Sequence, residues 1–278
     1  MATEDLEMQA EEPFEALEAA PSAFRSARVP LLVVVFAVGL MLFLAVEPTK
    51  PWILLVVTGI VALGADGIMR EHPLAARETD VAWTAPLLFL PTLLALGAGL
   101  FLEDALTGYW VLPGVLVAAL ILAGVLYAQH TSIDTQGALY PAARFVLNLG
   151  TYLAGFAFYA VVYTFDVSLV PAALTVGLIS VLLAVEVLRE AEADPVRALV
   201  YAGAIGVVIA EARWALYFLP LESYLAGVFL LLAFYVSSGL VQHHLNGDLR
   251  RPVIGEFVAI SSLGVLIVAL GRIFEAGT

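Results

Sequence analysis

Residues 29–46 read VPLLVVVFAVGLMLFLAV, and after the polar break Glu47-Pro48-Thr49-Lys50-Pro51, residues 52–69 read WILLVVTGIVALGADGIM. A helix needs about 20 mostly apolar residues to cross the hydrocarbon core of a bilayer. Each run has close to that length, and the break between them holds the prolines and charges that are typical of turns. The two runs therefore predict consecutive membrane-spanning helices joined by a short loop.

Similar runs fill the rest of the chain. Seven more apolar segments follow, at Val81–Leu102, Tyr109–Ala128, Phe145–Phe165, Ser168–Leu188, Val196–Leu219, Leu221–Val241 and Val253–Ile273. The weakest break is Asp166, but one helix across it would be far longer than a bilayer requires, so a tight hairpin is expected. Because the runs are continuous and do not alternate, they disfavour a β-barrel. The predicted fold class is all-α, a polytopic transmembrane bundle of about nine helices.

Composition supports lipid as the solvent for most of the chain. Hydrophobic residues make up 62% of the sequence and charged residues 13%, against about 25% charged in soluble domains. Residues 1–24 form a separate segment, in which seven of the first eighteen residues are acidic, and we expect it to be a disordered cytoplasmic tail. Residues 25–278 are expected to form one bundle domain. The chain has no cysteine, which excludes disulfides and thiolate chemistry.

The arginines predict the orientation of the bundle, because cytoplasmic loops of membrane proteins are enriched in basic residues. With the N-terminus inside, the predicted cytoplasmic segments hold Arg25, Arg28, Arg70, Arg77, Arg144, Arg189, Arg197, Arg250 and Arg251. The predicted external segments hold only Lys50 and Arg272. We therefore expect a multi-pass protein of the cell membrane with a cytoplasmic N-terminus and an external C-terminus.

A possible internal repeat follows from the same order. The second, fourth, sixth and eighth predicted helices each end in a polar cluster on the predicted cytoplasmic side, with Asp66, His130, Glu186 and His243 about sixty residues apart. This spacing is compatible with one lone helix followed by four helical hairpins. The alternative is that any series of hairpins of similar length produces such a spacing.

Ionisable residues within spanning segments are costly and are therefore candidates for function. They are Asp66, Glu186, Glu211, Arg213 and Glu256, with Arg272 at the end of the last helix. Asp66 has Arg70 four residues later, and Glu186 has Arg189 three residues later, which are spacings that allow pairing on one helix face. Interfacial ion pairs explain these two acids better than catalysis or transport does.

Glu211 and Arg213 give the sharpest functional hint. Two residues apart, they face nearly opposite sides of one helix and cannot pair comfortably with each other. Arg272 is a candidate partner for Glu211, and Asp166 or Glu222 for Arg213. A water-filled cavity and a structural interhelical ion pair explain the two charges equally well. Glu256, in contrast, falls in the first turn of a helix, where a carboxylate is favoured by the helix dipole.

Motifs for catalysis, metals and cofactors are not found in the sequence. His72, His130, His243 and His244 lack ligand spacing, and there is no Gly-x-Ser-x-Gly, Walker or Gly-x-Gly-x-x-Gly motif. We therefore expect no bound metal or cofactor, and the acidic, apolar chain is not expected to bind nucleic acid.

Three classes of function remain. The favoured one is a transporter-like bundle that binds a small solute or a lipid. The alternatives are a membrane-embedded enzyme acting on a lipid at the cytoplasmic face, built on Asp66, His130, Glu186 and His243, and a structural subunit that meets a membrane partner. Geometry discriminates between them: a polar cavity at Glu211 and Arg213 favours transport, whereas convergence of the cytoplasmic polar ends favours the enzyme.

Overall fold

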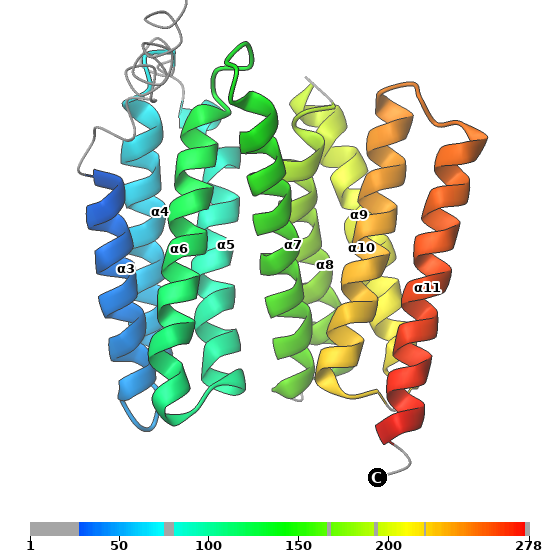
Figure 1. Cartoon of the computed structure of the whole chain (residues 1–278), viewed down its shortest axis with the longest axis horizontal. Helices are drawn as coiled ribbons and strands as arrows, with labels where there is room; N and C mark the ends of the chain where they lie inside the picture. Colours follow the sequence, from blue (N-terminus) through cyan, green and yellow to red (C-terminus); the bar gives the residue numbers. More distant parts are fainter. Residues whose placement is uncertain (1–27, 75–80, 166–167, 192–193, 220, 276–278) are drawn as a thin grey trace, which may run out of the picture.

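The computed structural model describes residues 28–74, 81–165, 168–191, 194–219 and 221–275. The predicted acidic tail and Asp166 lie outside the described residues. The described part of the chain contains nine α-helices and one short 3-10 helix, η2 (Gly108–Trp110), and no strand (Figure 1). The α-helices are α3 (Arg28–Ala45), α4 (Pro51–Arg70), α5 (Val81–Ala105), α6 (Val111–Thr131), α7 (Tyr140–Thr164), α8 (Leu169–Leu188), α9 (Pro195–Leu216), α10 (Ser223–Leu245) and α11 (Arg251–Glu275).

The helices confirm the predicted fold class. Eight of the described helices, α3 to α10, are long and apolar enough to cross a membrane. The hairpin expected around Asp166 is also confirmed, because α7 ends at Thr164 and α8 begins at Leu169. The largest difference from the prediction is the start of α7, which begins at Tyr140 rather than at Phe145. Proline is favoured in the first turn of a helix, and Pro141 at that place explains the earlier start.

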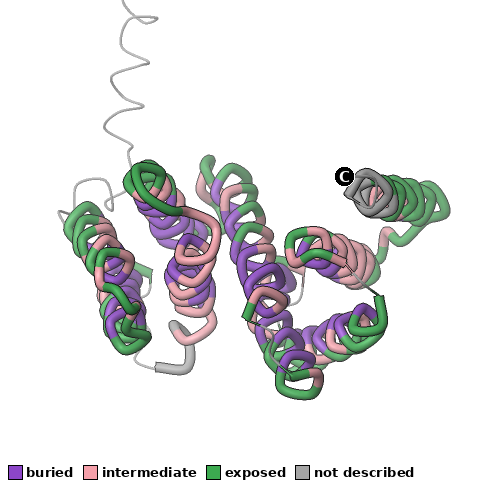
Figure 2. The backbone as a smooth tube through the Cα atoms, turned by 90° about the horizontal axis from the view of Figure 1, so that it is seen from below, coloured by how far each residue is buried: buried purple, intermediate pink, exposed green. Residues whose placement is uncertain are grey.

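The bundle consists of two groups of helices. Figures 1 and 2 show α3 to α6 on one side and α7 to α11 on the other, with α11 at the far edge beside α10. The interface between the groups is formed by α5 and α6 packing on α7, and by α5 on α8. We call the end of the bundle that carries loops 132–139 and 246–250 the inner end (top of Figure 1), because the arginine distribution predicts it to be cytoplasmic.

Two glycines allow α8 and α9, the two helices with the most extensive contact, to pack tightly. A Cβ atom on Gly177 would lie 3.1 Å from the carbonyl oxygen of Gly206, and one on Gly206 would lie 2.7 Å from the carbonyl oxygen of Gly177. Small residues at such positions let helix backbones approach in lipid, where van der Waals contact drives association.

Asp194 caps the start of α9 by accepting a hydrogen bond from the backbone N–H of Val196.

At the outer end, one carboxylate of α5 links the two groups. Asp104 accepts a hydrogen bond from the Thr164 hydroxyl of α7 at 3.2 Å and one from the Tyr224 hydroxyl of α10 at 3.1 Å. The two groups are therefore held by polar contacts at this end of the interface.

Candidate functional site

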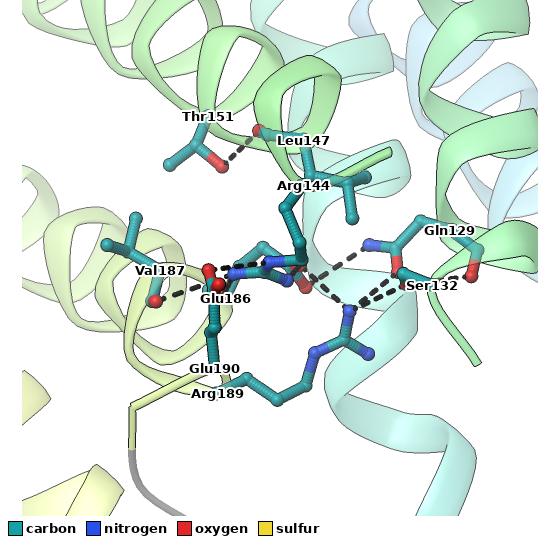
Figure 3. Close-up of polar contacts among 9 residues, drawn as sticks. All are labelled: Gln129, Ser132, Arg144, Leu147, Thr151, Glu186, Val187, Arg189 and Glu190. Carbon is teal, nitrogen blue, oxygen red and sulfur yellow. Dashed lines mark hydrogen bonds and ion pairs between the residues drawn. The ribbon is translucent and has the colours of Figure 1, made fainter. Parts of the chain in front are cut away.

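Glu186 is the centre of a buried polar cluster at the inner end of α8. Its side chain is fully buried, and it accepts hydrogen bonds from Arg144 at 3.0 Å, Arg189 at 3.0 Å and Gln129 at 3.2 Å (Figure 3). A buried carboxylate is stable only when it is paired and hydrogen-bonded. Three donors meet that requirement.

Arg144 fastens α7 to the end of α8. Its Nη2 donates to the carbonyl oxygens of Glu186 at 3.1 Å and Val187 at 3.5 Å, and its Nε donates to Glu190 at 3.1 Å. Carbonyls in the last turn of a helix have no partner within the helix, and a cation is favoured at that end of the dipole. Arg144 therefore satisfies both the carboxylate and the terminus of α8.

Arg189 extends the cluster to the other group of helices. Its Nη2 donates to Glu186, to the side-chain oxygen of Gln129 at 3.3 Å and to the Ser132 hydroxyl at 3.1 Å. Gln129 and Ser132 lie at the end of α6, in the first group, whereas Arg144 and Arg189 belong to the second. The cluster thus joins the two groups of helices at the inner end.

A polar cavity of about 210 Å³ adjoins this cluster. Pro86 and Leu87 of α5 and Ile133 form its apolar wall. Its polar lining consists of Ser132, Thr135, Tyr140, Arg144 and Arg189. All five polar side chains carry N–H or O–H donors, so the cavity presents donors and positive charge.

Two adjoining hollows within the spanning segments have a different character. The first, about 330 Å³, lies between α5, α6 and α7, and its lining includes Phe101, Val117 and Phe156. The second, about 270 Å³, lies between α6 and α7, has Val146 and Leu149 in its lining, and shares Ile121 and Leu153 with the first. Every side chain that lines either hollow is apolar apart from the indole N–H of Trp110. We call the two together the α6–α7 groove.

Both acids that the sequence placed near inner helix ends have the predicted partners. Asp66 pairs with Arg70 at 2.7 Å, and Glu186 pairs with Arg189 at 3.0 Å. The Asp66 pair is partly exposed, as interfacial pairing predicts. Glu186 differs, because the additional contact with Arg144 makes it part of an interhelical network rather than a surface pair.

Glu211 and Arg213 lie on different faces of α9, as their spacing predicted. Glu211 is exposed, whereas Arg213 is buried with its guanidinium carbon 4.0 Å from the centre of the Tyr163 ring. Among the described residues, Nε and Nη1 of Arg213 have no hydrogen-bond partner. The partner considered for Glu211, the side chain of Arg272, lies outside the described part, as does Asp166.

The histidines at the predicted cytoplasmic helix ends, His130 and His243, do not contact each other. The rings of His130 and His72 lie 4.7 Å apart, and His243 pairs with Asp248 at 2.9 Å. Glu256 is exposed near the start of α11. Of the four predicted polar ends, those of α6 and α8 are brought together, through Gln129 and Glu186.

Arg144 is the residue that sequence reasoning missed. The helix predicted from the sequence begins one residue later, at Phe145, which places Arg144 in a loop. The signal was present: Arg144 continues the buried face formed by Leu147, Thr151, Ala154 and Phe158, at the spacing of three and four residues that marks one side of a helix. Gln129 carried no comparable signal.

The fold and the buried ion cluster define a polytopic α-helical membrane protein whose two helix groups are joined at both ends by polar contacts. Residues 48–271 match a family model described as a protein of unknown function (DUF5656), so the chain belongs to the DUF5656 family. The matched region includes the ion cluster and the α6–α7 groove. No curated protein and no solved structure matches the chain.

Proposed function

We propose that this protein is a lipid-binding membrane bundle that holds an apolar lipid chain in the α6–α7 groove. The observation that carries the proposal is the apolar lining of the two adjoining hollows in membrane-spanning helices. Their volumes of about 330 and 270 Å³ fall in or near the range of ligand pockets. Apolar cavities exclude water and accept apolar ligands, and the ligand available at this depth is a hydrocarbon chain.

The groove is accessible from the membrane and matches one lipid chain in length. Leu120, Leu149 and Val117, which line it, are about half-exposed or more on the lipid-facing surface. Its lining on α7 runs from Val146 to Ala157, which corresponds to a rise of about 17 Å. Half of a hydrocarbon core is about 15 Å thick, so the groove is long enough for one acyl chain.

The chemistry of the inner cluster argues for binding rather than catalysis. A general base needs a lone pair within reach of its substrate. The Glu186 carboxylate is fully buried and accepts hydrogen bonds from three donors. This arrangement stabilises the charged carboxylate and keeps it from contacting a substrate. This favours the lipid-binding bundle over the membrane-embedded enzyme.

The proposal is tested by photo-crosslinking with a phosphatidylcholine that carries a diazirine in its acyl chain. Gly124 lies in the groove, where an added Cβ would meet only Val146, at 3.7 Å. Gly124→Leu is therefore expected to fill the groove while α6 and α7 remain packed. Mass-spectrometric mapping should show cross-links concentrated on lining residues of α6 and α7 in the wild type, and a several-fold loss in Gly124→Leu.

The matched control is Gly59→Leu, which adds the same side chain to an exposed position of α4 with nothing within 4 Å of its Cβ. Cross-linking in the groove should be unchanged in this variant. Labels spread evenly over all exposed helix faces, or an equal loss in both variants, would show that the groove holds only ordinary surrounding lipid.

A further inference from the structure

The polar cavity at the inner end has a lining suited to an anion. Among its polar side chains are two guanidinium groups, of Arg144 and Arg189, and the hydroxyls of Ser132, Thr135 and Tyr140. No carboxylate lines the cavity. Side chains that only donate, or that donate through a rotatable hydroxyl, complement a group with several acceptor oxygens.

Arg189 retains unused hydrogen-bonding capacity in this cavity. All three of its hydrogen bonds are made by Nη2, as Figure 3 shows, and its Nε and Nη1 have no partner among the described residues. The N–H groups of Nε and Nη1 are therefore unused donors, although they point to different sides of the guanidinium. Each can donate one charge-assisted N–H···O bond to an oxyanion. The side chain is 28% exposed and lines the cavity.

The cluster pairs two arginines with two acids, but only one of the acids contacts Arg189. Two arginines share one fully buried carboxylate, Glu186. The second acid, Glu190, is 38% exposed and contacts only the Nε of Arg144. Burial, opposed by Glu186 and reinforced by the charge of Arg144, lowers the pKa of Arg189. A further negative charge beside its unused N–H groups would stabilise the guanidinium.

We propose that this cavity binds a phosphate-type oxyanion at the inner surface of the membrane, with the unused N–H groups of Arg189 and the Tyr140 and Thr135 hydroxyls as its donors. The oxyanion is either the phosphate of a lipid headgroup or a free soluble phosphate, since both present the same acceptor oxygens. The site differs from the α6–α7 groove in its lining, because no residue lines both.

The test uses the full chain in phosphatidylcholine nanodiscs and two probes, inorganic phosphate and phosphatidic acid. Thermal unfolding is followed with increasing phosphate, against chloride at equal ionic strength, and with phosphatidic acid added to the disc. Native mass spectrometry counts the phosphatidic acid that stays bound. A rise in Tm with phosphate indicates a soluble ligand, whereas retention of phosphatidic acid without a response to phosphate indicates a headgroup.

Variants test whether phosphate or phosphatidic acid binds in this cavity. Arg189→Gln should weaken binding at least tenfold, and Tyr140→Phe, which removes only a hydroxyl, several-fold. Arg250→Gln removes an exposed arginine at the same end of the bundle and should leave binding unchanged. If Arg189→Gln does not fold, Tyr140→Phe decides, and unchanged affinity in that variant overturns the proposal.

Two other results also overturn it. One is that neither probe binds better than chloride and phosphatidylcholine. The other is that Arg250→Gln reduces binding as much as Arg189→Gln does, because binding would then reflect the general positive charge of the inner surface. The groove is measured separately by acyl-chain cross-linking, so failure of one proposal leaves the other intact.

Discussion

At the scale of single residues, the buried charge of Glu186 makes the inner cluster sensitive to substitution. Arg144→Gln removes one of its two cationic partners, and removing one member of a buried pair costs about 3–5 kcal/mol. We expect a clear fall in Tm, measured in detergent. The double variant Arg144→Gln/Glu186→Gln should recover part of the loss, because no uncompensated carboxylate remains. Arg250→Gln, at an exposed site, should change stability by less than about 0.5 kcal/mol. Equal effects of the two single arginine variants would contradict a structural role for Arg144.

At the scale of helices, the contact between α8 and α9 depends on the absence of a side chain at Gly206. Gly206→Ala places a Cβ 2.7 Å from the carbonyl oxygen of Gly177, and backbone cannot move aside as a side chain does. We expect a destabilisation of about 1–3 kcal/mol, the usual cost of overpacking. Gly203→Ala on the same helix meets nothing within 4 Å and should be neutral or stabilising by up to about 1 kcal/mol, through helix propensity. Thermal unfolding of the two variants side by side checks this, and similar values for both would exclude close packing as the cause.

At the scale of the whole molecule, the arginine distribution predicts which end of the bundle faces the cytoplasm. The chain has no cysteine, so a single introduced cysteine reports one position. Tyr109→Cys, in exposed η2 at the outer end, should react with a membrane-impermeant maleimide in intact cells. Gln136→Cys, in the exposed loop between α6 and α7, should react only after permeabilisation. The opposite pattern would reverse the orientation and move the proposed oxyanion site to the external face.

The sequence predicted those parts of the candidate sites that depend on local spacing. Asp66 pairs with Arg70, and Glu186 pairs with Arg189. Both pairs are predictable because residues three or four apart lie on the same face of a helix. Contacts between different helices could not be predicted from local spacing in the sequence. Arg144 and Glu186 are separated by 42 residues, and nothing in either local segment indicates that α7 and the end of α8 meet there.

What the sequence determined by itself is the existence, type and approximate bounds of the membrane-spanning helices. The physical reason is that hydrocarbon forbids unpaired backbone groups, so every long apolar run must become a helix whatever its neighbours are. Only the tertiary structure decided which helices meet. It also decided that Gln129, Arg144 and Arg189 surround Glu186, and that the side chains of neighbouring helices leave the α6–α7 groove between them. Those outcomes depend on the shapes of the side chains that meet across the two helix groups. In lipid, apolar helices associate through van der Waals packing and a few hydrogen bonds, and the hydrophobic pattern does not specify their partners.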